Sequence, residues 1–250
     1  MSENTPYKYL DFHVWGDYAL FSNPITSLSG ELCSYQVPTF SALRGITESI
    51  YWKPTIIIYI DRVRILKKIE TEAKDIRLFK YNDNKKSDLA RYTYLKDVAY
   101  QVQAHFEFNQ HRPDLAKDRN AKKHLAIMKR CIQRGGRRDI FLGVRECQGY
   151  VEPCEFGNDD GYYDDSLDLP FGTMVHGIDY PDEAGDDRMK IRLWQPIMRN
   201  GVIDFIRPEE CPVHKPLHEF PVKHFDYHDI QSVDELYSET MGDEDNELDY

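Results

Sequence analysis

The chain has 250 residues, which is long enough for one large domain or two small ones with a hydrophobic core. Apolar residues make up 41% and charged residues 30%, and these proportions exclude a wholly disordered chain. No apolar run approaches the roughly 20 residues that a membrane-spanning helix needs, and residues 1–20 lack the pattern of a signal peptide. We therefore expect a soluble cytoplasmic protein that does not bind a membrane.

The net charge of −11 is unevenly distributed. Ten acidic residues and no Lys or Arg lie between Asp226 and Tyr250, and the rest of the chain is close to neutral. The stretch from Arg112 to Arg145 contains eleven basic residues and only three acidic ones. A basic centre in an acidic chain indicates a surface for phosphate groups, and the alternative is a solvated charged helix face.

The five cysteines are an odd number, widely spaced and without a CxxC pair. A disulfide framework and a structural zinc site are therefore not expected.

The first part of the chain predicts a strand, a helix and a second strand. Residues Tyr9–Trp15 alternate as a short strand, and Asn23–Gly30 follow as a loop. Apolar residues recur at helical spacing over Pro38–Trp52, before a proline that stops the helix. The β-branched run Thr55–Leu66 predicts a buried strand, and the polar stretch Asp75–Ser87 predicts a loop or a projecting hairpin.

The clearest strand signal is the strict alternation of apolar and polar residues over Val98–Phe108. A helix is predicted next over Ala116–Arg134, ended by Gly135 and Gly136, and Asp139–Glu155 returns to extended structure. The order strand, helix, strand, strand, helix, strand is the ferredoxin-like (RRM-like) βαββαβ pattern of RNA-recognition folds.

The helix predicted over Ala116–Arg134 has an apolar face and a basic face. We expect His124 on its flank, near the edge of the apolar face. The residues expected to face the core are Ala121, Leu125, Met128 and Ile132, and those on the opposite side are Arg119, Lys123, Arg130 and Arg134.

These patterns predict an α+β protein in three parts. Residues 1–155 form the ferredoxin-like domain, 156–225 a small antiparallel β domain, and 226–250 an acidic, mobile tail. In the second part Thr173–Asp179 and Met189–Pro196 are predicted strands, while Pro208–Pro221 is predicted to be irregular. A short helix is expected at Val233–Tyr237.

Several common sites are missing from the chain, namely the GxxxxGK[ST], GxSxG, HExxH and GxGxxG motifs, so neither a cofactor nor a metal is predicted. The basic helix with Lys123 and His124 remains. RNA cleavage by the 2′-hydroxyl needs a proton acceptor, a cation and a proton donor, and His, Lys and Tyr side chains can supply these. Alone, Lys123 and His124 also fit an ordinary charged helix.

Long segments of the chain resemble one known family. They are "WGDYALFSNP", "YQVPTFSALRGITESIYWKP", "YTYLKDVAYQVQAHFEFNQHRPDL", "NAKKHLAIMKRCIQRGGRRDIFLGVRECQGYVEPCEF", "GTMVHGIDYPDE" and "RLWQPIMRNG". They are similar to CRISPR-associated protein family five of subtype I-C, also called the Dvulg type, and the resemblance covers roughly Tyr9 to Pro221.

The resemblance implies a RAMP-type endoribonuclease of prokaryotes. Such a protein cuts the CRISPR repeat in the precursor transcript without metal, at the base of the stem-loop, by 2′-hydroxyl attack. It then stays on the crRNA 5′ handle, beside the backbone and large subunits of the type I-C surveillance (Cascade) complex. DNA is a further partner that the resemblance leaves open.

The family's catalytic tyrosine corresponds to Tyr51, and its lysine and histidine to Lys123 and His124. We expect Lys123 to stabilise the phosphate charge and to lower the pKa of Tyr51. Tyr51 would then orient or deprotonate the 2′-hydroxyl and His124 would protonate the 5′-oxygen, or the two would exchange roles. The candidates for holding the RNA backbone are Arg119, Arg130, Arg134, Arg137 and Arg138, with plain surface charge as the alternative.

Three other functions compete with this one. The first is a non-catalytic subunit that binds the crRNA 5′ handle, the second is a structural assembly module, and the third is an unrelated metal-dependent nuclease.

Overall fold

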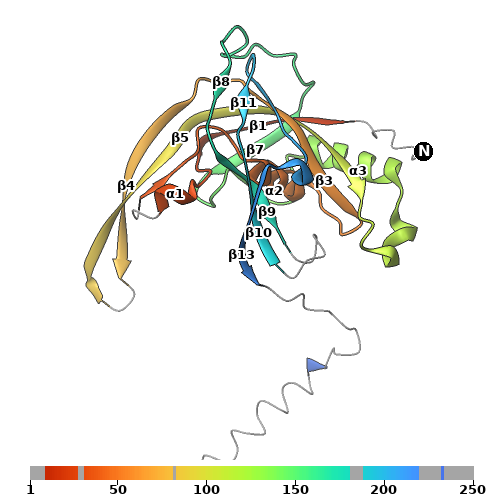
Figure 1. Ribbon diagram of the computed structural model, residues 1–250, viewed down its shortest axis with the longest axis horizontal. Helices are drawn as coiled ribbons and strands as arrows, with labels where there is room; N and C mark the ends of the chain where they lie inside the picture. The colour runs from red at the N-terminus through yellow and green to blue at the C-terminus, as the bar shows by residue number, and fades with distance from the viewer. Residues whose placement is uncertain (1–8, 28–30, 81–82, 181–187, 220–231, 234–250) are drawn as a thin grey trace, which may run out of the picture.

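The computed structural model describes residues 9–27, 31–80, 83–180, 188–219 and 232–233 (Figure 1). It is an α+β protein in which a large, mostly antiparallel sheet carries two helices on one face, as expected from the sequence. Nearly all of the acidic tail, including the helix expected at residues 233–237, lies outside the described residues. Within the described ranges, no helix has the length and apolar character that crossing a membrane requires.

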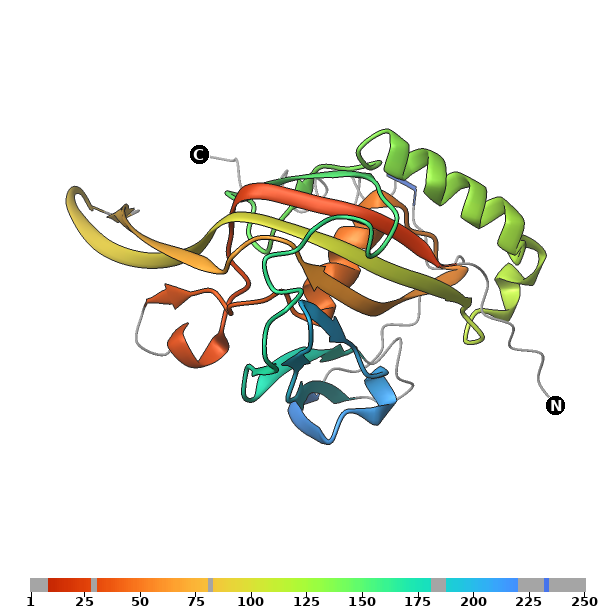
Figure 2. The same ribbon diagram turned by 90° about the horizontal axis from the view of Figure 1, so that it is seen from above.

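The main sheet is built around one long strand, β5 (Asp83–Phe108). Its second half contains the strand predicted over Val98–Phe108, and its first half pairs with β4 (Glu70–Lys80) in the projecting hairpin (Figure 2). The strand order is β12 (Val202–Asp204), β3 (Ile56–Ile65), β5, β1 (Leu10–Ala19), β7 (Gln148–Pro153) and β6 (Ile140–Phe141), with β2 (Leu32–Cys33) beside β5.

The alternation in β5 decides which face of the sheet is covered. Val102 pairs with Phe12 on β1 and with Val63 on β3, and all three side chains are fully buried. Phe106 lies two pairs further along the same face. This apolar face forms the hydrophobic core together with the two helices.

The first of these helices, α2 (Phe40–Ile50), begins two residues later than predicted. The Thr39 hydroxyl accepts a hydrogen bond from the amide of Ala42 at 3.2 Å and caps the helix, so Pro38 precedes the cap. The helix buries one apolar face and ends at Ile50, two residues earlier than predicted, and the backbone of the next residue, Tyr51, is extended. A four-residue helix, α1 (Pro24–Ser27), lies where a loop was expected.

The second helix, α3 (Ala121–Gln133), also begins later than predicted. The Asn120 side chain accepts a hydrogen bond from the amide of Lys123 at 3.1 Å, which sets the first turn. Residues 116–118 instead belong to a separate 3-10 helix, η1 (Pro113–Asp118), so the predicted start was wrong and Arg119 lies outside α3. The C-terminal end agrees, since Gly135 has a positive φ of 79°.

A second, three-stranded sheet packs against α2. Its strands are β9 (Met174–Asp179) and β10 (Arg188–Trp194), both predicted, and β13 (Val213–Glu219). The prediction of irregular structure over Pro208–Pro221 was therefore wrong. Pro216 is tolerated because, among the described residues, β13 is an edge strand that pairs with β10 alone, next to a register shift.

Short elements complete this part of the chain. They are β8 (Leu169–Pro170), β11 (Ile197–Met198) and the 3-10 helix η2 (Pro208–Glu210). The five cysteines are all free.

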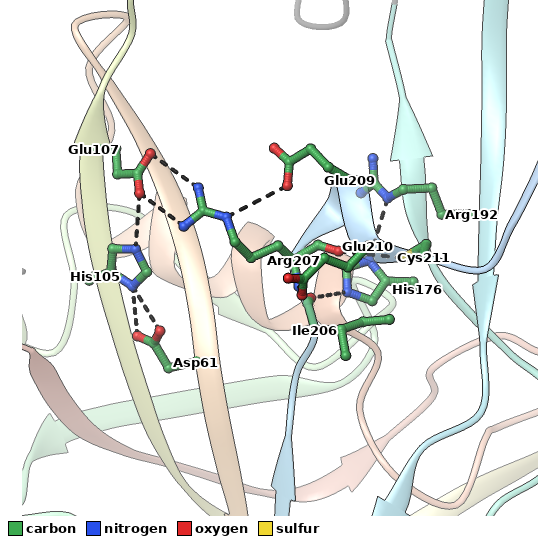
Figure 3. A network of polar contacts seen from close by, with 10 residues as sticks. All are labelled: Asp61, His105, Glu107, His176, Arg192, Ile206, Arg207, Glu209, Glu210 and Cys211. Atoms are coloured by element: carbon green, nitrogen blue, oxygen red, sulfur yellow. Dashed lines mark hydrogen bonds and ion pairs between the residues drawn. The ribbon is translucent and has the colours of Figure 1, made fainter. Parts of the chain in front are cut away.

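Polar contacts tie the segment before η2 to the main sheet (Figure 3). The guanidinium of Arg207 donates to both carboxylate oxygens of Glu107, at 3.0 and 3.2 Å, and lies 4.5 Å from the ring centre of Tyr59. The Arg207 contact holds the pKa of Glu107 below its usual range. On the same strands His105 Nδ1 lies 2.8 Å from the carboxylate of Asp61.

The fully buried side chain of His176 joins the second sheet to α2. Its ring stacks on Phe40 with the ring centres 4.2 Å apart, and its Nε2 donates to the carbonyl of Ile206 at 2.9 Å. Nδ1 then accepts from Nε of Arg192 at 3.4 Å, so the ring is neutral. Burial, with the Arg192 charge, lowers the pKa of His176 to about 4.

We predict that His176 makes the fold less stable in acid. The pKa in the folded state lies below that in the unfolded state, so the unfolded chain binds more protons between about pH 6.5 and pH 4. Stability is therefore fully present above that window and falls as the pH decreases through it, by about 2 kcal/mol between pH 7 and pH 5. Urea unfolding at the two pH values measures this. The His176→Gln variant should show a smaller loss, and an equal loss in both proteins would contradict the assignment.

Candidate active site

The C-terminal end of α2 and the first turn of α3 bring Tyr51 and His124 together. The Tyr51 hydroxyl lies 2.9 Å from Nδ1 of His124, across a separation of 73 residues in sequence. Tyr51 is 2% exposed and His124 is fully buried, whereas the flank of the helix was expected for His124. Its ring packs edge-on against Phe106 and Phe108 of β5. The pair therefore lies in the core between the sheet and the two helices.

The hydrogen bonds of His124 define its tautomer. Its Nε2 lies 2.9 Å from the backbone carbonyl oxygen of Asp118, which can only accept, so Nε2 carries the proton in the neutral ring. Nδ1 is then free to accept from the Tyr51 hydroxyl. The pair is thus arranged as a proton donor, Tyr51, that faces a proton acceptor, Nδ1.

The environment of Tyr51 works against its ionisation. Burial raises the pKa of Tyr51, and the negative charge of Asp118 raises it further. The positive charge of Arg137 lowers the pKa but is a smaller effect. The pKa of Tyr51 is therefore raised, whereas we expected Lys123 to lower it, and the cation whose charge lowers it is Arg137.

Next to the Tyr51–His124 pair, Lys123 forms a partly exposed ion pair with Asp118. The same carboxylate accepts a hydrogen bond from the Thr55 hydroxyl at 2.8 Å, and its Oδ2 lies 3.5 Å from Nε2 of His124. Lys123 and Thr55 hold the pKa of Asp118 below its usual range. The side chain of Lys123 is 44% exposed, so it is the member of the predicted catalytic trio that faces solvent.

The five candidate RNA-binding arginines do not share one environment. Arg119 donates to the backbone carbonyls of Asn109 and Arg112, at 2.9 and 3.4 Å, and so holds the segment that carries η1. The other four are exposed on α3 and on the turn after it, namely Arg130, Arg134, Arg137 and Arg138. The turn docks on α2, because the amide of Arg138 donates to the carbonyl of Ser49 at 3.1 Å.

Sequence reasoning missed Asp118 and Thr55 as members of this site. Asp118 carried a signal, since it is one of three acidic residues in the strongly basic stretch 112–145. Thr55 carried none, because a threonine at the start of a β-branched strand is ordinary.

We predict that the buried hydrogen bond between Tyr51 and His124 stabilises the fold. Tyr51→Phe should lower the free energy of unfolding by about 1–3 kcal/mol, because Nδ1 of His124 loses its partner in the core. Urea unfolding measures the change. Tyr162→Phe is the control, since Tyr162 is 62% exposed and should be near neutral. Equal effects of the two substitutions would contradict the geometry.

A buried Tyr–His pair in hydrogen-bond contact, beside an exposed lysine on a basic helix, provides the groups that proton transfer next to an anion requires. Comparison with known proteins then gives the family. A family model described as CRISPR-associated protein (Cas_Cas5) matches residues 9–206, which is most of the chain. The chain belongs to this family, in its subtype I-C branch, as the resemblance had predicted.

Named relatives agree with this assignment. The chain is 30% identical to the CRISPR pre-crRNA endoribonuclease Cas5d of Mannheimia succiniciproducens, over 77% of this chain and 92% of that protein. It is also 30% identical to the CRISPR pre-crRNA endoribonuclease Cas5d of Thermus thermophilus, over 70% of this chain and 76% of that protein. A crystal structure of a CRISPR-associated protein is 34% identical, with a TM-score of 0.73, over 86% of this chain and all of that one.

Proposed function

We propose that this protein is an endoribonuclease that cuts CRISPR repeat RNA in the precursor transcript, with Tyr51, Lys123 and His124 as its catalytic residues. The observation that carries the proposal is the buried Tyr51–His124 hydrogen bond beside Lys123. It occurs in a chain that is 30% identical to two proteins named as pre-crRNA endoribonucleases.

The reaction begins with a proton relay. The 2′-hydroxyl of the nucleotide before the cut gives its proton to the Tyr51 oxygen, while Tyr51 gives its own proton to Nδ1 of His124. Tyr51 does not have to ionise first, which fits the raised pKa of its hydroxyl. The 2′-oxygen then forms a bond to the adjacent phosphorus.

The second half of the reaction releases the 5′-oxygen. Lys123 stabilises the extra negative charge that develops on the phosphate oxygens. As the bond from phosphorus to the 5′-oxygen breaks, Nε2 of His124 donates its proton to that oxygen. The products are a 2′,3′-cyclic phosphate and a 5′-hydroxyl, and His124 ends with its proton on Nδ1. No step in this scheme requires a metal ion.

We predict that cleavage of a cognate repeat RNA continues in EDTA and depends on His124. His124→Ala should slow single-turnover cleavage by about 10²–10⁴-fold, because both proton transfers are lost. Lys123→Ala should slow it by about 10²–10³-fold. Lys122→Ala is the matched control on the same helix, and it should retain the wild-type rate. Products with a 5′-phosphate and a 3′-hydroxyl would exclude this mechanism.

We further propose that the exposed arginines of α3 and the following turn hold the RNA backbone. Arg134→Ala should weaken binding and reduce the slope of log affinity against log salt by about 0.7–0.9 for each phosphate that this arginine neutralises. Binding titrations at several salt concentrations measure the slope. Arg91→Ala is the control, because Arg91 lies on the projecting hairpin and pairs with Asp75. An unchanged slope for Arg134→Ala would show that this arginine does not bind a phosphate.

After cleavage, we propose, the protein stays on the crRNA 5′ handle as a subunit of the type I-C surveillance complex, beside the backbone and large subunits. The alternative is a non-catalytic subunit that binds the same handle. Binding of repeat RNA without cleavage by the wild-type protein would favour the alternative, and the catalytic trio would then position RNA.

The finer description of the fold is also a proposal. The order β3-β5-β1-β7, with α2 after β1 and α3 after β5, supports a ferredoxin-like arrangement for residues 1–155. Residues 156–225 would form the second domain, which joins the first through the pairing of β12 with β3.

A further inference from the structure

The carboxylate of Asp118 sits in a cluster of groups that together bind an oxyanion. Lys123 supplies a cation, Thr55 a hydroxyl donor at 2.8 Å, and Nε2 of His124 an N–H that lies 3.5 Å from Oδ2. Thr55 is 1% exposed and His124 is fully buried, so two of the three donors are fixed by the core. Such charge-assisted contacts suit phosphate oxygens as well as a carboxylate.

The arrangement around Asp118 is closed to substrate. Tyr51 and His124 are 2% and 0% exposed, yet a proton relay requires contact with the 2′- and 5′-oxygens of RNA. Nε2 of His124 is engaged by the Asp118 backbone carbonyl at 2.9 Å. Asp118 therefore fills the anion site with its carboxylate. Its backbone carbonyl also engages Nε2 of His124, which must reach the leaving 5′-oxygen of the RNA.

The segment that carries Asp118 lies outside the core. It is the 3-10 helix Pro113–Asp118, in which none of the residues is buried. Displacing such a segment exposes little apolar surface, in contrast to the core positions of Thr55 and His124, and the contacts that Asp118 gives up are ones that a phosphate can replace.

We propose that the site filled by the Asp118 carboxylate is the binding site for the scissile phosphate, with Thr55 as a further phosphate-binding residue. The RNA displaces Asp118 before it is cut. This inference rests on the proposed function and adds to it the residues that receive the phosphate. The exchange replaces one anion by another, so Lys123 and Thr55 keep an acceptor and the uncovered Nε2 faces the phosphate.

The experiment compares Asp118→Asn, Thr55→Val and Thr55→Ser with the wild-type full chain. Binding is measured with a repeat RNA whose nucleotides at the base of the stem-loop are 2′-deoxy and cannot be cut, and single-turnover cleavage is measured with the normal repeat. Asp114→Asn is the matched control, because Asp114 lies in the same 3-10 helix and pairs with Arg112 at the surface. Urea unfolding checks that each variant is folded.

The expected result is tighter binding by Asp118→Asn, by about tenfold, because the competing charge is gone, with a cleavage rate at least as high as in the wild type. Thr55→Val should bind about tenfold more weakly, and Thr55→Ser, which keeps the hydroxyl, should bind like the wild type. Asp114→Asn should change neither quantity.

Two outcomes would overturn the inference. One is slower cleavage by Asp118→Asn without a gain in affinity, which would make Asp118 a residue that positions Lys123 or His124. The other is equal binding by Thr55→Val, Thr55→Ser and the wild type. If Asp118→Asn does not fold, the difference in RNA binding between Thr55→Val and Thr55→Ser decides whether the inference stands. Because binding is measured on uncut RNA, a wild-type protein that binds without cutting would refute the proposed cleavage and still leave the phosphate site tested.

Discussion

The hydrogen bond between Tyr51 and His124 lies in the same buried layer that holds α2 and α3 on the sheet. Its donor is the residue that follows α2, its acceptor is in the first turn of α3, and β5 supplies the aromatic rings that enclose it. Packing of the two helices on the sheet therefore also brings the pair together. A change that loosens either helix is expected to separate the pair, although the carbonyl of Asp118 also holds the His124 ring.

This constraint explains why the ends of the two helices matter more than their lengths. The cap at Thr39 fixes where α2 begins, and its last residue, Ile50, is followed by the extended Tyr51, whose hydroxyl meets His124 of α3. The cap at Asn120 likewise fixes where α3 begins and leaves residues 113–119 outside it. The carbonyl of Asp118, just outside the helix, then accepts both from the amide of Asn120 at 2.8 Å and from Nε2 of His124 at 2.9 Å.

The fold was largely predictable because its strongest signals are local. The alternation over Val98–Phe108 and the spacing of apolar residues before Tyr51 report directly on which face is buried. The start of α3 was missed because helix propensity continues smoothly through Ala116, and only the Asn120 side chain marks the true start. Strand β13 was missed because Pro216 within it, with Pro212 just before it, disfavours a strand unless the strand is known to lie at an edge.

The site was less predictable than the fold. Family resemblance marked Tyr51, Lys123 and His124, but periodicity placed His124 on a helix flank, because a histidine is not counted as apolar although its ring fills core space here. Contacts between segments that lie far apart in the chain, such as that of Thr55 with Asp118, leave no periodic trace in a sequence.

The negative charge of Asp118, in a strongly basic stretch, affects the ionisation of Tyr51 and therefore the chemistry of the site. Asp118 neutralises Lys123, and its charge adds to the effect of burial in raising the pKa of Tyr51. A phosphate in the same place would carry a similar charge, and Tyr51 would again hold its proton. A mechanism that needs a tyrosinate would thus be opposed both before and after RNA binds. A relay in which Tyr51 passes one proton while it receives another avoids that cost, because no negative charge forms on the tyrosine ring and the positive charge that forms on His124 lies next to the phosphate.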